Sequence, residues 1–329
     1  MNTRPHILLT GGTGFFGKAL LRHRAAQALT GPDLPRITLL SRDPQSFADQ
    51  HPALVEQPGL NLVRGDICDA GSLPRDIPFT HVLHAAAEST NGPALSPLQR
   101  YDQIVQGTRN LLDLALQCGA KRFLLTSSGA VYGAQAPELA ALPESWCGSP
   151  DSMRPDQAYG MGKRAAEHLC ALYAQTHRLE TVVARCFAFV GPDLPLDVHF
   201  AIGNFIRDAL WANAITVHGD GSPVRSYMDQ SDLAHWLFAL LDRGRSGQAY
   251  NVGSPHAIRI SDLAELVRDT LAPGKPIHIL GQANPQALRN LYVPDVHKIS
   301  IELGLSIQMP LSEAIVRAAA AQATGARLP

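Results

Sequence analysis

Short apolar runs alternate with longer amphipathic stretches through the first half of the chain. The stretches have the apolar spacing of helices, and they predict helices at Gly17–Ala28, Asp102–Cys118 and Gln157–His177. The runs rich in isoleucine, valine and leucine predict β-strands at His6–Thr10, Ile37–Ser41, Leu60–Val63, His81–Ala85, Phe123–Ser127 and Thr181–Ala184. Strands that are apolar throughout are buried on both faces, so this order indicates a parallel sheet covered by helices, a doubly wound Rossmann-type α/β fold.

The pattern changes after about residue 185, where prolines separate shorter segments. A strand at Ala249–Val252 is expected to return to the main sheet. We therefore expect a Rossmann domain over residues 1–185, with a return segment near 225–253, and a smaller lobe over 186–329. Helices are predicted in the lobe at 201–214, 230–242, 261–271 and 312–322.

Composition narrows the function classes. The 329 residues are 45% hydrophobic and 17% charged, which is typical of a chain with a large core. A net charge of −1 gives no basic surface for nucleic acid, so no such partner is expected. The five cysteines show no CxxC spacing, and neither a disulfide framework nor a metal site is predicted. No apolar run is long enough to span a membrane and no signal peptide is evident, so we expect a cytoplasmic protein without a membrane partner.

A glycine-rich turn follows the first predicted strand and opens a helix. Gly11 would permit the tight turn, Gly14 would let the backbone approach a pyrophosphate, and Gly17 would allow close packing of helix on sheet. The GxxGxxG spacing is one residue longer than the dehydrogenase GxGxxG. Its place between strand and helix predicts a dinucleotide site. Asp66, after the third strand, is either an adenine contact or a plain turn residue.

Seven segments occur in the order of one enzyme family: GGTGFFG (11–17), GDI (65–67), HAAA (84–87), SSGAVYG (127–133), YGMGK (159–163), GDGSPVRSY (219–227) and YNVGS (250–254). In these the chain resembles the extended short-chain dehydrogenases/reductases, the NAD(P)-dependent nucleotide-sugar epimerase, dehydratase and reductase family. The resemblance covers essentially the whole chain. It implies an NAD(P)-binding first domain, a nucleotide-diphosphate sugar bound between that domain and a C-terminal substrate lobe, and a homodimer.

The glycine turn, the strand ends and the resemblance together indicate the residues that bind the cofactor. They are Gly11, Thr13, Gly14, Phe15, Phe16, Gly17, Ser41, Arg42, Asp66, Ile67, Ala85, Ala86, Ala87, Tyr159 and Lys163.

A tyrosine and a lysine carry the candidate chemistry. Tyr159 and Lys163 are four residues apart, so on a helix they share one face. An ammonium beside a phenol favours the phenolate, and we expect it to lower the pKa of Tyr159 towards working pH. Tyr159 would then act as general acid/base. The resemblance adds the Ser128 hydroxyl, which would polarise a sugar carbonyl, whereas His84 is predicted to be a buried strand histidine.

Substrate contacts are implied by the resemblance alone. Arg225 and Arg289 are expected to grip the diphosphate, because guanidinium groups pair with phosphate oxygens. Ser128 and Asn204 are further candidates. The alternative for each arginine is an ordinary solvated side chain.

The chain departs from the family pattern where the reaction type is set. Ile104 and Ala188 replace asparagines, and Gly129 and Ala130 stand where 4,6-dehydratases carry an Asp-Glu pair. Elimination of water then has no obvious acid and base. We expect a 4-ketoreductase of a nucleotide-activated 4-keto-6-deoxyhexose. The alternative is a 4-epimerase with retained NAD, and a 4,6-dehydratase or a non-catalytic NADP-binding sensor is less favoured.

The end of the second strand bears on the cofactor. NAD-specific members carry an acidic residue there, which binds the ribose hydroxyls. Here Ser41 removes that charge and Arg42 could pair with a 2′-phosphate, which favours NADP(H). NAD(H) is the alternative, with Asp43 taking the acidic role in a shifted loop.

Overall fold

The chain divides into two compact units. The computed structural model describes residues 4–29, 34–87, 95–198, 200–282 and 290–325. Unit 1 comprises Met1–Gly133, Ser149–Cys186 and Ala234–Tyr250, and unit 2 comprises Ala134–Gly148, Phe187–Leu233 and Asn251–Pro329. The assignment of cofactor binding to 1–185 and of substrate binding to 186–329 stays a prediction.

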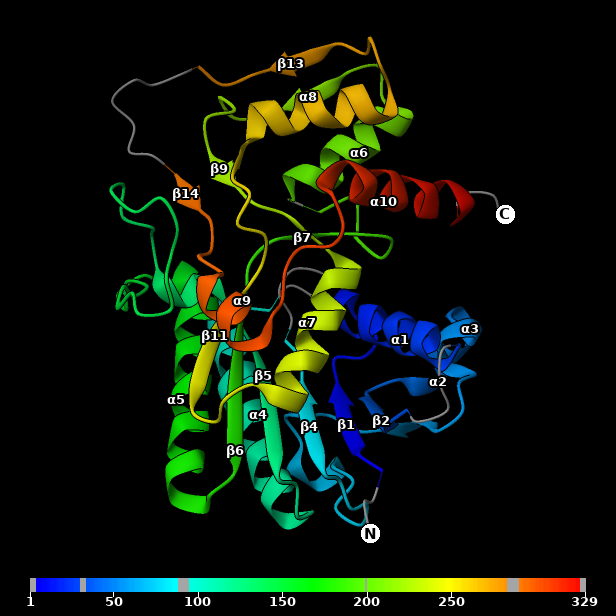
Figure 1. Ribbon diagram of the computed structural model, residues 1–329, viewed down its shortest axis with the longest axis vertical. Coiled ribbons are helices and arrows are strands. Elements are labelled where there is room, and N and C mark those ends of the chain that lie inside the picture. The colour runs from blue at the N-terminus through cyan, green and yellow to red at the C-terminus, as the bar shows by residue number, and fades with distance from the viewer. Residues whose placement is uncertain (1–3, 30–33, 88–94, 199, 283–289, 326–329) are drawn as a thin grey trace. The chain divides into compact units, whose positions relative to one another are not determined.

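Unit 1 is built on a seven-stranded sheet with the order β11-β6-β5-β4-β1-β2-β3 (Figure 1). The five pairings that join β1 to β6 across this order are all parallel. The predicted Rossmann-type fold is confirmed, as is the return of β11 to the main sheet. The strands are β1 (His6–Thr10), β2 (Arg36–Ser41), β3 (Leu60–Arg64), β4 (His81–His84), β5 (Arg122–Ser128), β6 (Glu180–Cys186) and β11 (Gln248–Val252).

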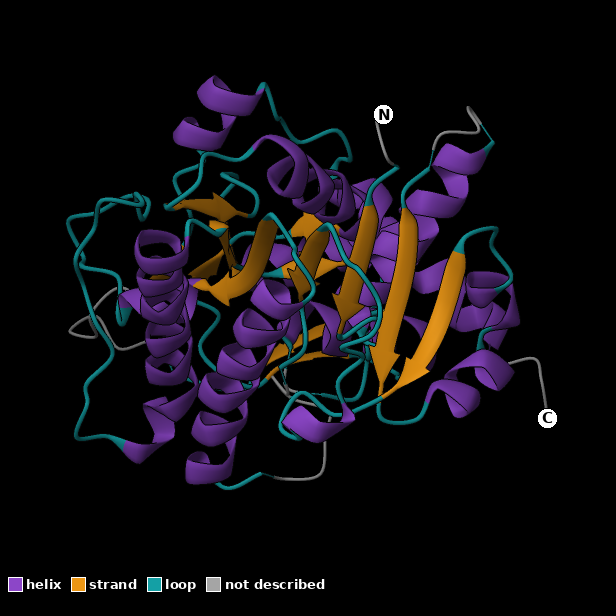
Figure 2. Cartoon of the chain, turned by 90° about the horizontal axis from the view of Figure 1, so that it is seen from below, coloured by secondary structure: helices purple, strands orange, loops and turns teal. Residues whose placement is uncertain are grey.

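Helices lie on both sides of this sheet (Figure 2). They are α1 (Phe15–Ala28), α2 (Pro44–Gln50), α3 (Pro52–Val55), α4 (Pro97–Gln117), α5 (Ala158–His177) and α7 (Gln230–Arg243), with short 3₁₀ helices η1 (Ala70–Ser72), η2 (Gly129–Tyr132) and η3 (Pro155–Gln157). Helix α4 begins five residues before the predicted Asp102. Ser96 and Gln99 form a capping box there, with Pro97 in the first turn, so the local sequence starts the helix early.

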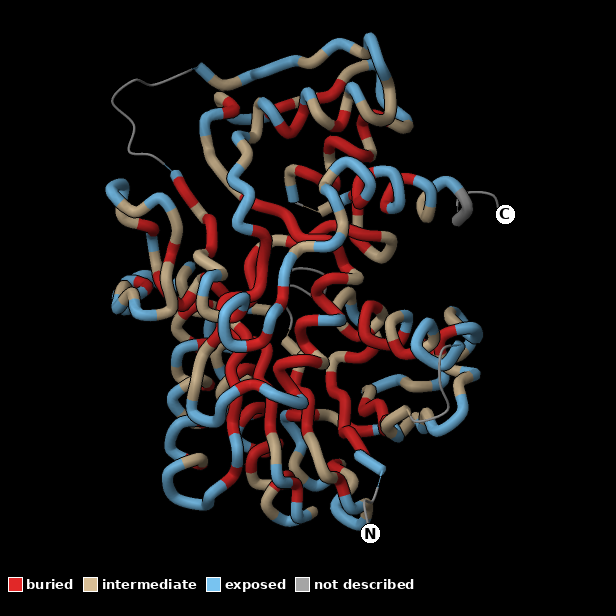
Figure 3. The backbone as a smooth tube through the Cα atoms, in the orientation of Figure 1, coloured by how far each residue is buried: buried red, intermediate tan, exposed pale blue. Residues whose placement is uncertain are grey.

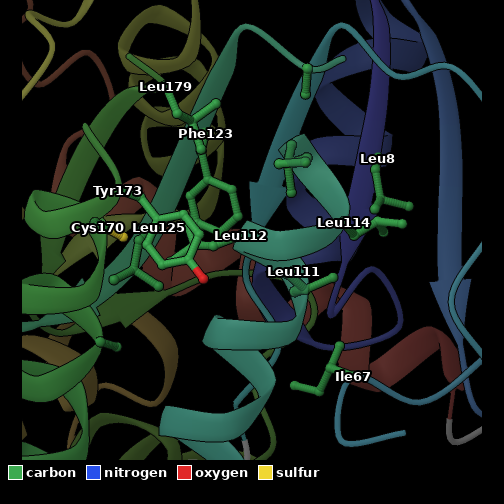
Figure 4. Packing of buried hydrophobic residues seen from close by; sticks show 14 of the residues in the cluster. Leu8, Ile67, Leu111, Leu112, Leu114, Phe123, Leu125, Cys170, Tyr173 and Leu179 are labelled. Atoms are coloured by element: carbon green, nitrogen blue, oxygen red, sulfur yellow. The ribbon is translucent and has the colours of Figure 1, made fainter. Parts of the chain in front are cut away.

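One large apolar cluster lies where α4 and α5 cover the sheet (Figure 4). Leu8, Phe123 and Leu125 project into it from the strands, and Leu111 and Cys170 from the helices. On β1 and β5 the intervening residues are buried too, so these inner strands are enclosed on both faces, whereas β3 at the edge is partly exposed (Figure 3). The sheet therefore forms a stiff base for the side chains at its strand ends.

Unit 2 contains short strands that carry too few residues for a recognisable pattern. They form three small sheets, β10-β7, β12-β9-β14 and β13-β8. The strands are β7 (Phe189–Val190), β8 (Ile215–Val217), β9 (Val224–Arg225), β10 (Met228–Asp229), β12 (Ile258–Arg259), β13 (Ile277–Ile279) and β14 (Leu291–Tyr292), and the helices are α6 (Ala201–Trp211), α8 (Ile260–Leu271), α9 (His297–Leu303) and α10 (Leu311–Gly325). In the described parts of the chain, no helix has both the length and the apolar character needed to cross a membrane.

Candidate active site

The glycine turn packs tightly against the end of a neighbouring strand. Gly11 has a φ of 72°, a conformation that favours glycine. A Cβ atom on Gly11 would lie 2.5 Å from the carbonyl carbon of Ala85, just after β4. A Cβ on Gly17 would lie 2.1 Å from Cα of Gly12, so helix α1 rests directly on the turn. Both positions therefore require glycine.

The start of α1 is suited to a pyrophosphate. Gly14 is the N-cap residue of α1. It has no side chain, so the backbone N–H groups of the first turn receive no side-chain cap. The first turn also holds no acidic residue, so no side-chain charge offsets the positive end of the helix dipole. A Cβ on Gly14 would meet only the Gly11 carbonyl oxygen, at 3.6 Å. Thr13, Phe15 and Phe16 are partly exposed beside it.

The ends of β2 and β3 carry the residues predicted to face adenosine. The Asp43 carboxylate accepts a hydrogen bond from Ser46 N at 3.1 Å and caps helix α2. Asp43 is thereby engaged in the local fold. Arg42 lies close enough to Cys68 for its charge to lower the pKa of that thiol, against the larger effect of burial, which raises the pKa. Arg42 therefore lies near the segment that follows β3.

That segment is ordered by local hydrogen bonds. Asp66 Oδ1 accepts from Cys68 N at 2.9 Å, which is the turn role weighed for Asp66. Ile67 is buried, and its carbonyl oxygen accepts a hydrogen bond from Asn110 Nδ2 of α4 at 2.7 Å. Ala85, Ala86 and Ala87 follow β4, where the Gly11 turn approaches.

The structure brings Ser128, Tyr159 and Lys163 together. Ser128 is the last residue of β5, and its side chain is hydrogen-bonded to the Tyr159 phenol. Lys163 is only 3% exposed, and its Nζ donates a hydrogen bond to the Thr126 carbonyl oxygen at 2.7 Å. The same Nζ lies 5.9 Å from the centroid of the Tyr159 ring. The arrangement has a hydroxyl, a phenol and an ammonium at one strand end.

The electrostatics of the phenol differ from the expectation. Burial raises the pKa of Tyr159 to about 12, and its hydrogen bond to Ser128 and the charge of Arg100 only partly oppose this. The expectation that Lys163 lowers this pKa towards working pH was wrong, because removal of the phenol from water has the larger effect. Burial also lowers the pKa of Lys163 to about 8. At neutral pH the Tyr159 phenol is therefore protonated, and Lys163 carries its positive charge in most molecules.

Arg100 is a further residue near the phenol, and no sequence motif contains it. It lies in the first turns of α4, and its Nε is buried with no hydrogen-bond partner among the described residues. Its charge lowers the pKa of Tyr159. No motif singles out this position, and only the fold brings α4 to the phenol.

His84 is buried and fully hydrogen-bonded, as the strand pattern predicted. Its Nδ1 pairs with Thr10 Oγ1 at 2.8 Å and its Nε2 with Thr108 Oγ1 at 3.2 Å. Thr108 Oγ1 donates its proton to the Ile104 carbonyl oxygen, so it accepts from His84 Nε2–H, and Nδ1 accepts from Thr10. Burial, followed by the charge of Lys163, lowers the pKa of His84 to about 3, so the ring stays neutral.

The candidate substrate residues in unit 2 are only partly described. Arg225 lies on β9, and its Nη1 donates to the carbonyl oxygens of Val224 and Asn290. Asn204 lies on α6, where its Oδ1 accepts from Arg207 at 3.3 Å. Arg289 falls outside the described residues. Substrate binding by Arg225, Asn204 and Arg289 stays a prediction.

The family comparison agrees with this geometry. Residues 7–253 match the model of the NAD dependent epimerase/dehydratase family. The chain belongs to this family. The resemblance to the extended short-chain dehydrogenases/reductases is thereby confirmed.

Curated relatives and solved structures extend the comparison. UDP-glucuronic acid decarboxylase 1 of Xenopus tropicalis is 30% identical over 318 residues, which cover 95% of this chain and 70% of the relative. UDP-glucuronic acid decarboxylase 5 of Arabidopsis thaliana is 30% identical, with coverage of 94% and 86%. A dTDP-glucose 4,6-dehydratase from Streptomyces venezuelae, solved with NAD, has a TM-score of 0.80 at 25% identity, with 97% of each chain covered. A UDP-glucose 4-epimerase from Thermotoga maritima has a TM-score of 0.80 at 19% identity, with 98% and 100% covered, and shares the fold.

We expect Tyr159→Phe to fold and to bind the dinucleotide like the wild type, but to lose turnover by roughly 10²–10⁴-fold, because it lacks the proton donor. Circular dichroism, dinucleotide titration and steady-state rates check this. Tyr101→Phe, which removes a phenol from α4 outside the Ser128 contact, serves as the control. A Tyr159→Phe variant with wild-type turnover would exclude the phenol from catalysis.

Proposed function

We propose that this protein is an NAD(P)(H)-dependent nucleotide-sugar oxidoreductase that reduces the 4-keto group of a nucleotide-activated 4-keto-6-deoxyhexose. The observation that carries the proposal is the Tyr159 phenol, which is hydrogen-bonded to Ser128 and has its pKa raised to about 12. A phenol that keeps its proton at neutral pH is suited to give it to an alkoxide, and an alkoxide forms when a ketone is reduced.

In this proposal a bound dinucleotide supplies the hydride to the carbonyl carbon. The Ser128 hydroxyl donates a hydrogen bond to the carbonyl oxygen and polarises it. Tyr159 gives its proton to that oxygen as negative charge develops there. The hydrogen bond from Ser128 and the charge of Arg100, which lower the pKa of Tyr159, then stabilise the phenolate that is left.

The residues around Ser128 support redox chemistry over elimination. Gly129 and Ala130 carry no carboxylate, and η2, which contains them, is held by the Ala130 N to Ser128 Oγ hydrogen bond at 3.1 Å. A dehydratase would need an acid and a base for the loss of water. The intact Ser128, Tyr159 and Lys163 also argue against a sensor that binds NADP without catalysis.

Epimerisation is the second candidate, because the same phenol and lysine could first remove and then return a proton at a sugar hydroxyl. A 4-epimerase keeps its cofactor and reduces the opposite face of its own keto intermediate. Such an enzyme begins with phenolate as base, which a raised Tyr159 pKa disfavours.

The assay uses purified protein with 4-keto-6-deoxyhexoses linked to dTDP, UDP or GDP, together with NADPH or NADH. We expect loss of the nicotinamide absorbance in proportion to the deoxyhexose formed, and no such loss with Tyr159→Phe. UDP-galactose and UDP-glucuronic acid without added cofactor are the comparison substrates. Conversion of either, with no reduction of any keto sugar, would replace the ketoreductase proposal by an epimerase or a decarboxylase.

We propose a preference for NADP(H), supported by Arg42 near the segment after β3 and by the use of Asp43 as a helix cap. NADPH should bind more tightly than NADH, and Arg42→Ala should narrow the gap by roughly ten- to a hundredfold, since a charge-assisted hydrogen bond contributes about 1.5–3 kcal/mol. Calorimetry with both cofactors checks this, with Arg268→Ala, which removes a partly exposed arginine of α8, as the control. Tighter binding of NADH by the wild type would reverse the preference.

We also propose a homodimer formed through α4 and α5. These helices pack side by side on one face of the sheet (Figure 2). Leu172 of α5 is 43% exposed. Light scattering at micromolar concentration should give the mass of a dimer, and Leu172→Glu should shift it towards that of a monomer. A monomeric wild type would refute this arrangement.

A further inference from the structure

Helix α5 is joined to the end of β5 by a ladder of three polar contacts. Tyr159, Lys163 and Glu167 are spaced by four residues, so they lie on one face of the helix, one per turn. They contact three consecutive residues of β5. The Tyr159 phenol is hydrogen-bonded to the Ser128 side chain. Lys163 Nζ donates a hydrogen bond to the Thr126 carbonyl oxygen at 2.7 Å. Glu167 Oε1 accepts a hydrogen bond from Ser127 Oγ at 2.5 Å. The third contact has no part in the proposed chemistry.

Glu167 is itself held by an arginine from the next strand. Arg185 Nη2 donates to Glu167 Oε2 at 2.7 Å, and Arg185 Nε lies 3.1 Å from Oε1. The two side chains are only 17% and 13% exposed, so this is a largely buried, forked ion pair. Arg185 Nη1 also donates to the Tyr132 hydroxyl at 3.0 Å, and its guanidinium lies 4.8 Å from the centre of that ring. The pair thus joins α5, β5, β6 and η2.

We propose that Glu167, held by Arg185, is a positioning residue of the acid/base site: it fixes the Ser127–Ser128 strand end against α5 and places a negative charge one helical turn from the Lys163 ammonium. This inference rests on the proposed function only where it assigns proton transfer to Ser128, Tyr159 and Lys163. Loss of the ladder's third contact leaves Ser127 free to rotate and the Ser128 hydroxyl less well placed. Small errors in placement cost rate heavily.

The charge of Glu167 acts on Lys163 directly. Burial lowers the pKa of Lys163 to about 8, while the negative charge of Glu167 raises it. The groups that face this ammonium are Tyr159, Glu167 and Cys170 on α5, Cys186 on β6, neutral His84 on β4 and the Thr126 carbonyl on β5. The positive charge of Arg185 on β6, which is paired with Glu167, partly offsets the effect of the Glu167 charge on Lys163. Removal of either member of the pair therefore shifts the pKa of Lys163, and the two shifts have opposite signs.

The test is an NMR titration of protein labelled with ¹³C at the lysine ε-carbon. The chain has five lysines, and loss of one signal in Lys163→Met assigns the resonance. We expect Glu167→Gln, which keeps the shape and removes the charge, to lower the pKa of Lys163 by roughly one pH unit. Arg185→Gln should raise it, and the double variant should return it towards the wild-type value. Shifts of the same sign, or none in Glu167→Gln, would overturn the charge effect.

Two further variants separate position from charge. Glu167→Asp keeps the charge but is too short to hold both Ser127 and Arg185, so the pKa of Lys163 should stay near the wild-type value while kcat falls roughly ten- to a hundredfold with little change in KM. Glu180→Gln is the control. It breaks the Arg122–Glu180 ion pair at the first residues of β5 and β6, the strand ends far from Ser128, and should change neither the pKa of Lys163 nor kcat. An unchanged kcat in Glu167→Asp would overturn the positioning role.

The titration needs no substrate, so it distinguishes the two proposals. If no sugar nucleotide is converted but the opposed shifts appear, the proposed function fails while the electrostatic role of Glu167 holds. If conversion occurs and the shifts are missing, only the role of Glu167 fails.

Discussion

The hydrogen bond from the Lys163 ammonium to the Thr126 carbonyl is the constraint on which the site depends. It takes a cation out of water, which is costly, and it is tolerated because the carbonyl and the surrounding polar groups compensate. The bond also requires α5 to lie close to the strand end. Gly160 makes this possible, since a Cβ there would lie 2.8 Å from the Ala130 carbonyl oxygen. A Cβ on Gly162 would lie 3.3 Å from the end of the Ile104 side chain, a tight contact that a small movement of that side chain relieves. Gly160 of YGMGK therefore serves packing, while the tyrosine and lysine of the same motif are the candidates for chemistry.

Much of the fold could be predicted from the sequence, because buried parallel strands and amphipathic helices leave strong periodic patterns. The strand His6–Thr10 was predicted to the residue, and α5 to within one residue. Strands of two or three residues, such as β9, contain no period and were missed. The segment 134–148 belongs to unit 2 although it lies between parts of unit 1, which no local pattern reveals.

The sequence was sufficient to predict which residues of the candidate site lie together, but not the ionisation state of the phenol. The spacing of Tyr159 and Lys163 indicated a shared helix face, and the structure has them together with Ser128. The ionisation of the phenol depends on burial, which sequence spacing does not give. The Glu167–Arg185 pair joins residues 18 apart on different elements, and neither is distinguished by its neighbours. At position 104, where the family carries an asparagine, the apolar side chain of Ile104 fills the space beside Gly162.

The hydrogen bonds of His84 have a further consequence. Thr10 donates to the ring, the ring donates to Thr108, and Thr108 donates to a backbone carbonyl, so every proton in this row points the same way. Reversing the row would require a change of tautomer and would remove the Thr108 hydroxyl proton from the Ile104 carbonyl oxygen. A row of fixed polarity is a permanent dipole and does not conduct protons. In the proposed reduction, the proton that Tyr159 donates therefore has to be replaced along another route, through groups that can reorient.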